Sequence, residues 1–360
     1  MRAQKFIISG GGTGGHIFPA VAIANALKKR MPDCEILFVG ANGRMEMEKV
    51  PQAGYTIKGL NIAGFQRGSI LKNLMLPFKV LSSLKEASKI IKGFKPNAAI
   101  GVGGYASGPL LFAASFAGVP CVIQEQNSFA GITNKILAKR AKKICVAYDG
   151  MEKVFPKEKI VMTGNPVRAE ILNKQVNREE ALRYFGLNAG KKTVLVVGGS
   201  LGARTLNESV YESLNKIKGS NVQFLWQTGK TWNKENLGLE NVKQLTFIDR
   251  MDYAYACADV IVSRAGALSI AELQNIGKPL ILVPSPNVAE DHQTHNAMAL
   301  VNNEAAILVR DNEAKTNLIN EVFELIAEED KQKKLSENIS KMGIGNAAER
   351  IVDEILGLIK

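Results

Sequence analysis

Short apolar segments rich in β-branched residues alternate with longer helical patterns along the whole chain. Each segment is followed by a turn and then by a stretch long enough for a helix, which is typical of a parallel sheet with helices on both faces. In the first half, the expected strands are residues 5–9, 35–39, 55–60, 98–102, 121–125 and 143–147. In the second half, they are residues 193–197, 222–226, 242–247, 260–263, 279–283 and 305–309. The pattern therefore predicts an α/β protein with doubly wound, Rossmann-like sheets.

The two series of strands are separated at Gly164-Asn165-Pro166, where turn-forming residues interrupt the alternation. A chain of 360 residues is also too long for one core, because single cores stop growing at about 250–300 residues. We expect an N-terminal domain over residues 1–164 and a C-terminal domain over residues 165–346, while a helix over 347–360 could pack on either. Both series begin with a strand that enters a glycine loop. Since ligands of such sheets bind beyond the carboxyl ends of the strands, the two loops are expected to line a cleft between the domains.

Residues 98–124 form an uncharged stretch that could be mistaken for a membrane span. The stretch contains seven glycine and proline residues. So many helix breakers favour a strand, a glycine loop, a helix and a second strand over one spanning helix.

Basic residues concentrate in the first half of the chain. The net charge is +12, yet residues 1–165 hold 23 Lys and Arg against 9 Asp and Glu, whereas residues 166–360 hold 23 against 25. Within residues 58–95, eight basic side chains accompany one acid, Glu86. Such a cluster suits an anionic partner, either nucleic acid or the cytoplasmic leaflet of a membrane.

Apolar residues recur at helical spacing between residues 69 and 92, and Pro77 interrupts them. This pattern predicts a short helix, a break, and a longer helix from Pro77. An ordinary core-facing stripe would look the same, but the local basic charge favours an amphipathic segment lying on a membrane. The residues expected to meet the membrane are Leu71, Leu74, Met75 and Phe78.

The first glycine loop satisfies the pattern GxGxxG through Gly10, Gly12 and Gly15. Backbone N–H groups of such a loop, at the start of an expected helix over 17–30, can cradle a phosphate or pyrophosphate. A dinucleotide site also needs an acid at the end of the second strand, to hold the ribose hydroxyls. Residues 38–42 contain none, so phosphate binding is favoured over NAD or FAD, and a merely tight turn is the remaining alternative.

The chain has three histidines, of which His16 follows the first glycine loop at a helix start. The positive end of the helix dipole there should disfavour the imidazolium ion, so we expect the ring to be a neutral base. The alternative is a structural histidine. His292 and His295 are spaced as metal ligands can be, but no third ligand completes a site, so no metal is expected.

Two motifs of the second half suit phosphate and ribose binding. Residues 198–203 form a second glycine loop in which Ser200 adds a hydroxyl, and residues 263–272 join a strand to a helix expected to start near Ala267. Glu272, early in that helix, can accept hydrogen bonds from both hydroxyls of a ribose. Alternatively, it is a glutamate merely favoured near a helix N-terminus.

Together these motifs resemble the MurG family, the inverting N-acetylglucosaminyltransferases of glycosyltransferase family 28. The segments that carry the resemblance are GGGTGGHIFPA at 10–20, GVGGYASGP at 101–109, QEQNSFAGITNK at 124–135, GNPVR at 164–168, GGSLGA at 198–203, SRAGALSIAE at 263–272 and DHQTHNA at 291–297. The resemblance implies the GT-B fold, with the nucleotide-sugar on the C-terminal domain and the lipid-linked acceptor on the N-terminal domain.

The resemblance also assigns roles to single residues. It implies that His16 and Glu125 lie near the reacting hydroxyl. We favour His16 as the catalytic base, and Glu125 is a chemically reasonable competitor. The implied donor-binding residues are Thr13, Gly14, Gly15, Asn127, Arg168, Ser200, Ile248, Ala267, Leu268, Ser269, Glu272 and Gln293. The implied acceptor-binding residues are Gly103, Gly104, Tyr105 and Asn134, with the Thr13–Gly15 loop also near the acceptor pyrophosphate.

The implied reaction is transfer of N-acetylglucosamine (GlcNAc) from UDP-GlcNAc to lipid I, undecaprenyl-pyrophosphoryl-MurNAc-pentapeptide, at the cytoplasmic face of the bacterial plasma membrane. The implied partners are UDP-GlcNAc, lipid I and anionic inner-membrane lipids, with no nucleic acid, cofactor or metal. A UDP-sugar epimerase or another GT-B glycolipid glycosyltransferase is the main alternative. A nicotinamide oxidoreductase lacks its ribose acid, and an inert membrane-binding module leaves the loop motifs unexplained.

Overall fold

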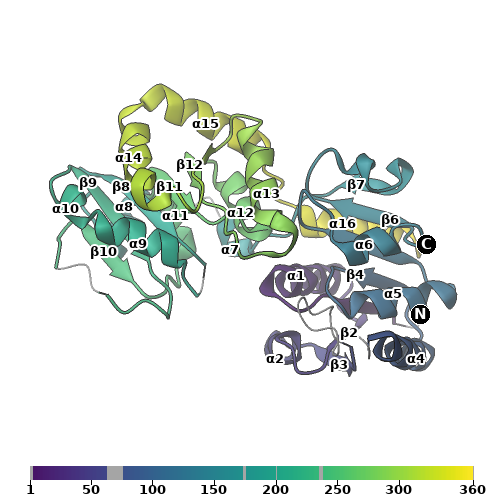
Figure 1. Cartoon of the computed structure of the whole chain (residues 1–360). Helices are drawn as coiled ribbons and strands as arrows, with labels where there is room; N and C mark the ends of the chain where they lie inside the picture. The colour runs from purple at the N-terminus through teal and green to yellow at the C-terminus, as the bar shows by residue number, and fades with distance from the viewer. Residues whose placement is uncertain (1–2, 63–75, 173–175, 200, 235–237, 360) are drawn as a thin grey trace. The chain divides into compact units, whose positions relative to one another are not determined.

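The structure, a computed structural model, describes residues 3–62, 76–172, 176–199, 201–234 and 238–359. It divides the chain into two compact units. Unit 1 comprises Met1–Val167 and Asn346–Lys360, and unit 2 comprises Arg168–Gly345. Each unit is a parallel sheet with helices around it (Figure 1), which confirms the predicted α/β class.

The sheet of unit 1 has the order β3-β2-β1-β4-β5-β6-β7, and every described pair of neighbouring strands is parallel. Its strands are β1 Lys5–Ser9, β2 Glu35–Ala41, β3 Thr56–Leu60, β4 Ala98–Gly101, β5 Cys121–Glu125, β6 Lys143–Val146 and β7 Ile160–Met162. Six of these match expected strands. The pattern missed β7, because three half-buried residues are too few to show a period.

Helices cover both faces of this sheet. They are α1 Gly14–Arg30, α2 Glu46–Gln52, α4 Leu76–Phe94, α5 Ser107–Phe116, α6 Ile132–Leu137 and α16 Ala347–Gly357, with short 3₁₀ turns η1 Met151–Lys153 and η2 Lys157–Lys159. Side chains of α4, α5 and α6 pack on the face that Ile7 occupies. Side chains of α1 and α16 pack on the face of Phe6 and Ile8. The uncharged stretch 98–124 is thus a strand, a helix and a strand, and none of the described helices is long and apolar enough to cross a bilayer.

The C-terminal helix α16 completes unit 1, which the sequence left open. Ile351, Val352 and Ile355 are buried in the same core cluster as α1 (Figure 1, yellow). Arg30 of α1 forms an ion pair with Asp353 at 2.7 Å, although this pair is exposed and contributes little. The helix is therefore held mainly by burial of its apolar side.

We expect Ile355→Ala to destabilise unit 1 by about 2–5 kcal/mol, because the side chain is fully buried and its loss leaves a cavity. Urea unfolding followed by circular dichroism measures the change. Glu349→Ala, an exposed substitution on the same helix, is the matched control. Equal stability of the two variants would show that α16 does not contribute to the core.

The sheet of unit 2 has the order β10-β9-β8-β11-β12-β13, again parallel at each described pair. Its strands are β8 Lys192–Val197, β9 Val222–Gln227, β10 Val242–Leu245, β11 Val260–Ser263, β12 Leu280–Leu282 and β13 Ile307–Leu308. Its helices are α7 Ala169–Leu172, α8 Arg178–Phe185, α9 Arg204–Glu212, α10 Leu214–Lys218, α11 Met251–Cys257, α12 Ala267–Ile276, α13 His292–Val301, α14 Ala314–Ala327 and α15 Glu329–Lys341, with a 3₁₀ turn η3 Ala289–Asp291. All six expected strands of this half are present.

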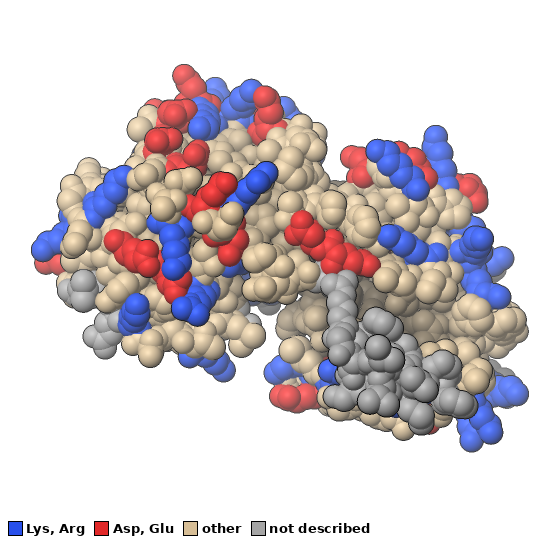
Figure 2. All heavy atoms as spheres, in the orientation of Figure 1, with Lys and Arg blue, Asp and Glu red and all other residues tan. Residues whose placement is uncertain are grey.

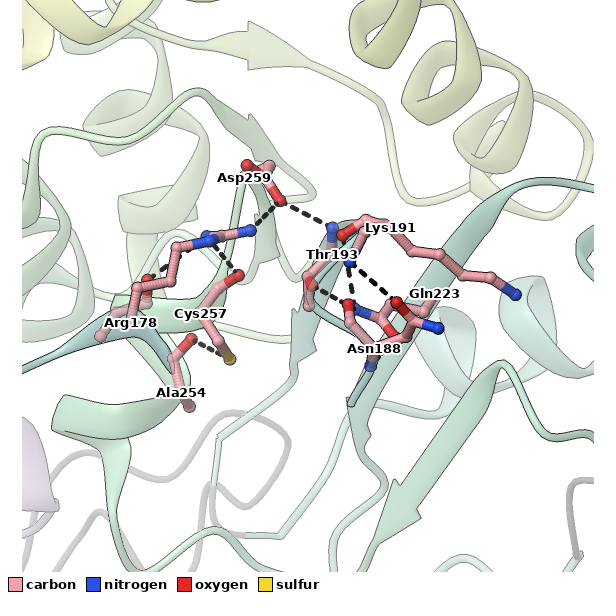
Figure 3. Close-up of polar contacts among 10 residues, drawn as sticks. Arg178, Asn188, Lys191, Thr193, Gln223, Ala254, Cys257 and Asp259 are labelled. Atoms are coloured by element: carbon pink, nitrogen blue, oxygen red, sulfur yellow. Dashed lines mark hydrogen bonds and ion pairs between the residues drawn. The ribbon is translucent and has the colours of Figure 1, made fainter. Parts of the chain in front are cut away.

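A network of polar contacts lies at the edge of this sheet where the strands begin (Figure 3). Asp259, directly before β11, accepts hydrogen bonds from Arg178 Nη2 at 2.8 Å and from the Thr193 N–H at 2.7 Å. Gln223 at the start of β9 donates to Asn188 O at 2.8 Å. These contacts fasten α8 and the β8 entry loop to the sheet, at the edge opposite to the carboxyl ends where ligands of such sheets bind.

Candidate functional site

In unit 1, three of the sequence motifs follow β1, β4 and β5, which are neighbours in the sheet. Because the carboxyl ends of parallel strands meet at one edge, the loops after these strands lie together there. The Gly11 N–H donates to Gly103 O at 3.3 Å, which joins the first loop to the second. Gln126 Nε2 donates to Val102 O at 2.8 Å, which joins the third loop to the second.

Helix α1 begins at Gly14, so the expected start at residue 17 was wrong by three residues. Thr13 is the N-cap residue, with extended backbone angles. Glycine is a poor helix former, and for this reason the pattern did not include Gly14 and Gly15. Gly14 and Gly15 are the first residues of a 17-residue helix. Their N–H groups have no partner within the helix and lie at the positive end of its dipole.

The half-buried His16 packs between the first two loops. Its Nδ1 lies 3.0 Å from Gly11 O and 3.4 Å from Thr13 Oγ1. Because a carbonyl oxygen can only accept, Nδ1 carries the hydrogen in this contact, and the neutral ring keeps its lone pair on Nε2. Gly103 has a φ of +99°, and a Cβ atom there would stand 2.8 Å from His16 Nε2. The glycine therefore provides the space that the imidazole occupies.

Ser107, which was not among the residues expected from the sequence, joins the second loop to the end of β1. Its hydroxyl lies 2.7 Å from Gly103 O and 3.0 Å from Ser9 O, in a fully buried position. The neighbouring Tyr105 is half exposed. A serine six residues after a buried strand carries no signal by itself, because its contact with Ser9 O joins residues 98 positions apart in the chain.

The Glu125 carboxylate, at the end of β5, is buried and accepts four hydrogen bonds. Oε1 accepts from the N–H and the side-chain Nδ2 of Asn127, at 3.1 and 3.3 Å. Oε2 accepts from the Gly131 N–H at 3.0 Å and from Asn134 Nδ2 at 2.9 Å. These contacts commit both oxygens to holding the loop 126–131 and the start of α6. Glu125 is therefore suited to positioning Asn127 and Asn134.

Three buried carboxamides, which were not among the residues expected from the sequence, connect this edge with the segment after β7. Gln124 Nε2 donates to Asn165 Oδ1 at 2.8 Å, and Asn165 Nδ2 donates to Gln126 O at 2.8 Å. Gln126 Nε2 also contacts Gln124 Oε1. The network ties the motif at 124–127 to the motif at 164–168.

In unit 2, Glu272 lies in the second turn of α12 and is 8% exposed. Arg168 forms a bidentate ion pair with it, from Nε to Oε1 at 2.7 Å and from Nη2 to Oε2 at 2.8 Å. The Tyr255 hydroxyl donates to Oε2 at 3.3 Å. Burial, and secondarily the adjacent Glu272 charge, raise the pKa of Tyr255 well above its usual value, so it remains a donor. The sequence predicted Arg168 and Glu272 as donor residues but not their direct pairing.

The N-terminus of α12 is formed as expected, from Ala267 after the N-cap residue Gly266. The N–H groups of Ala267, Leu268 and Ser269 belong to its first turn and are available to an anion. Gln293 Oε1 accepts from the N–H of Ser285 at 2.9 Å and of Ala265 at 3.2 Å. The carbonyl end of Gln293 is thus engaged, and its Nε2 is the end that can donate to a ligand. Ser200 lies outside the described residues.

Gln227, at the end of β9, holds two parts of the expected nucleotide site. Its Nε2 donates to Gly199 O in the second glycine loop, and its Oε1 accepts from the Ile248 N–H, both at 3.0 Å. Ile248 is buried. Similarly, Asp311 accepts from Thr205 Oγ1 at 3.0 Å and from Arg264 Nη1 at 2.5 Å, which links α9 to the loop before α12. Neither Gln227 nor Asp311 stood out in the sequence.

The expected membrane residues are only partly covered by the structure. Leu71, Leu74 and Met75 lie outside the described residues, as does the expected short helix, and Phe78 lies in α4, which begins at Leu76. Other apolar side chains of unit 1 are exposed, among them Leu81 of α4 at 65%, Phe116 of α5 at 70% and Ile136 of α6 at 63%. The Arg140 guanidinium lies 4.3 Å from the Phe116 ring centroid. On the face drawn in Figure 2, several Lys and Arg side chains lie over unit 1 at its right edge.

Comparison with known proteins agrees with these motifs. Residues 6–146 match the glycosyltransferase family 28 N-terminal domain, and residues 193–351 match the glycosyltransferase family 28 C-terminal domain. The chain belongs to glycosyltransferase family 28. It is 54% identical to the UDP-N-acetylglucosamine–N-acetylmuramyl-(pentapeptide) pyrophosphoryl-undecaprenol N-acetylglucosamine transferase of Flavobacterium psychrophilum, over 100% of this chain and 99% of that protein. It is 56% identical to the protein of the same name from Phocaeicola vulgatus, over 98% of this chain and 96% of that protein.

A solved structure supports the family 28 fold over both units. The crystal structure of MurG from Acinetobacter baumannii superposes with a TM-score of 0.83 at 30% identity, covering 98% of this chain and 99% of that one. The two parallel sheets are therefore those of a GT-B glycosyltransferase.

Proposed function

We propose that this family 28 enzyme transfers GlcNAc from UDP-GlcNAc to the C4 hydroxyl of MurNAc in undecaprenyl-pyrophosphoryl-MurNAc-pentapeptide, forming a β-1,4 bond with inversion. The main support for the proposal is that relatives named for this transfer are 54% and 56% identical to this chain over nearly its full length. Unit 2 holds the donor and unit 1 holds the acceptor. The site geometry supports each of these assignments separately.

Donor binding uses the buried carboxylate and the helix start of unit 2. Glu272 accepts hydrogen bonds from the ribose hydroxyls, and the carbonyl of Ile248 accepts one from the uracil ring. The first-turn N–H groups of α12 receive the diphosphate, and the Gln293 amide donates to the sugar. Fixed N–H dipoles at a helix start stabilise the negative charge that develops on departing UDP.

Acceptor binding uses the edge of unit 1 where the three loops meet. The N–H groups of Gly14 and Gly15, with the Gly103–Tyr105 loop, hold the pyrophosphate of the acceptor at the positive end of α1. His16 Nε2 takes the proton from the attacking hydroxyl. Inversion requires a single displacement and therefore one base, and a positioned base accelerates such a step by about 10²–10⁴-fold.

The enzyme is proposed to work as a peripheral protein on the cytoplasmic leaflet, where anionic lipids attract the basic first half of the chain. The exposed side chains of Leu81, Phe116 and Ile136 support this proposal, because each can enter the lipid interface while Lys and Arg nearby meet the headgroups.

We expect the triple variant Leu81→Ser, Phe116→Ser, Ile136→Ser to bind anionic vesicles at least about tenfold more weakly, since burying one such side chain contributes about 1.5–3 kcal/mol. Co-sedimentation with phosphatidylglycerol vesicles measures this. Turnover of a water-soluble, short-chain acceptor should be unchanged. Val154→Ser, at another exposed apolar position of unit 1, is the control. If the triple variant binds vesicles as tightly as the unmutated protein, these three side chains do not enter the lipid interface.

The function is tested by incubating the protein with UDP-GlcNAc and a short-chain lipid I analogue, followed by mass detection of the disaccharide product. UDP release that depends on the acceptor supports the transfer. Conversion of UDP-GlcNAc into an epimer without acceptor would instead identify the alternative, a UDP-sugar epimerase.

A further inference from the structure

Glu46 is a buried carboxylate that contacts the first glycine loop and that none of the motifs includes. It is the first residue of α2 and is 1% exposed. Its Oε2 accepts from the Gly12 N–H and its Oε1 accepts from the Ala41 N–H, both at 2.9 Å. The side chain therefore joins the end of β2 to the loop that follows β1.

The Glu46 side chain packs against two positions that have no room for a Cβ atom, and both are glycine. A Cβ atom at Gly11 would overlap the Glu46 carboxylate, and a Cβ atom at Gly40 would overlap its Cγ. The first loop has the glycine spacing of a dinucleotide fingerprint, but the Glu46 carboxylate accepts the hydrogen bond of the Gly12 N–H.

The Gly12 N–H and the Gly11 carbonyl belong to the same peptide group, which is planar. The N–H side of this peptide donates to Glu46, and the carbonyl side accepts from His16 Nδ1 at 3.0 Å. A continuous chain of hydrogen bonds thus runs from the Glu46 carboxylate through one peptide to the imidazole. Hydrogen bonds in such a chain polarise and strengthen one another.

We propose that Glu46 is a positioning residue for His16, and this rests on the proposed role of His16 as the base. The carboxylate fixes the orientation of the Gly11–Gly12 peptide, which two glycines would otherwise leave free to rotate. The peptide then keeps the hydrogen of the neutral ring on Nδ1 and the lone pair on Nε2. The same chain stabilises the ring when Nε2 takes up the proton of the attacking hydroxyl.

The kinetic test is Glu46→Gln, alone and combined with His16→Ala. The single oxygen of the glutamine amide can replace only one of the two carboxylate oxygens. Either the Gly12 N–H or the Ala41 N–H therefore loses its hydrogen bond. We expect kcat to fall about tenfold to a hundredfold, as for a small misplacement of a reacting group, with UDP affinity unchanged. In the His16→Ala background, the same substitution should cost less than about threefold, because coupled residues are not additive. Equal losses in both backgrounds would overturn the proposal.

The matched control is Glu48→Gln, the same substitution two residues away on an exposed side chain. It should leave kcat, UDP affinity and the melting temperature unchanged. Loss of turnover with Glu48→Gln comparable to that with Glu46→Gln would mean that the effect belongs to α2 in general, and would overturn the role of the Glu46 carboxylate.

A second measurement needs no turnover, and its decisive result comes from the unmutated protein. The chain has only three histidines, so ¹⁵N-histidine NMR can assign His16 by its disappearance in His16→Ala. We expect the neutral ring of the unmutated protein to carry its hydrogen on Nδ1, and Glu46→Gln to shift hydrogen to Nε2. A ring that carries its hydrogen on Nε2 in the unmutated protein overturns the proposal. Because this readout is independent of catalysis, failure of the proposed transferase activity would be recognised separately, in the product assay.

Discussion

Replacing His16 with alanine is expected to lower kcat by about two orders of magnitude or more, because a positioned general base contributes about 10²–10⁴-fold. UDP affinity should change little, since the residues proposed for the nucleotide belong to unit 2. The acidic limb of the pH profile of kcat/KM should also disappear, because that limb reports protonation of the base in the free enzyme. Steady-state kinetics with the soluble acceptor across a pH series measures both effects.

Glu125→Gln is the necessary comparison for this prediction. Its carboxylate already accepts hydrogen bonds from Asn127, Gly131 and Asn134. We therefore expect Glu125→Gln to lower kcat through misplacement of these groups and to retain the acidic limb. If His16→Ala keeps the limb and most of kcat while Glu125→Gln abolishes both, the base is Glu125.

Glu272→Gln is expected to weaken UDP binding about tenfold to a hundredfold. Hydrogen bonds to a charged group are worth about 1.5–3 kcal/mol, and the neutral amide cannot accept from two ribose hydroxyls as the carboxylate does. The KM for the donor should rise accordingly, while the KM for the acceptor stays close to that of the unmutated enzyme. Isothermal titration calorimetry with UDP gives the affinity directly. Unchanged affinity would refute the assignment.

Arg168→Ala separates the two functions of the Glu272 carboxylate. In the structure, the Arg168 guanidinium occupies both carboxylate oxygens, so the ribose must share or displace it. We expect Arg168→Ala to leave uridine affinity equal or higher, because uridine has no phosphate that an arginine can hold. Glu272→Gln should weaken uridine and UDP alike. The pair of variants thus distinguishes ribose recognition from loss of a structural ion pair.

Local patterns predicted most of the strands because the buried strands of a parallel sheet are continuous apolar runs. The two errors in the predicted elements also have local causes. Residues 160–162 are too short to show a period, and α1 starts at Gly14 because the N-terminal turn uses glycines that propensity assigns to a loop. His16 and Glu272 could be proposed from the sequence because each stands in the early turns of a helix that follows a strand and a loop, which is a feature of adjacent residues.

The contacts that organise the candidate site were not predictable in the same way. Glu46 binds a residue 34 positions away, Gln227 one 28 positions away, and Asp311 one 47 positions away. In the sequence, these three are ordinary polar residues. Their partners are set by which strands become neighbours, as when β4 joins β1 after a gap of almost ninety residues.

The sequence by itself determined the alternation of strands and helices, the two glycine loops, and the residues whose chemistry suits a nucleotide-sugar and a base. Only the tertiary structure decided that α16 belongs to unit 1, that the Glu125 carboxylate is committed to its own loop, and that Glu46 reaches His16 through one peptide. The physical reason is that hydrophobic periodicity and turn propensity act between near neighbours in the chain. Strand order, burial and hydrogen-bond partners depend instead on packing between segments that are far apart in sequence.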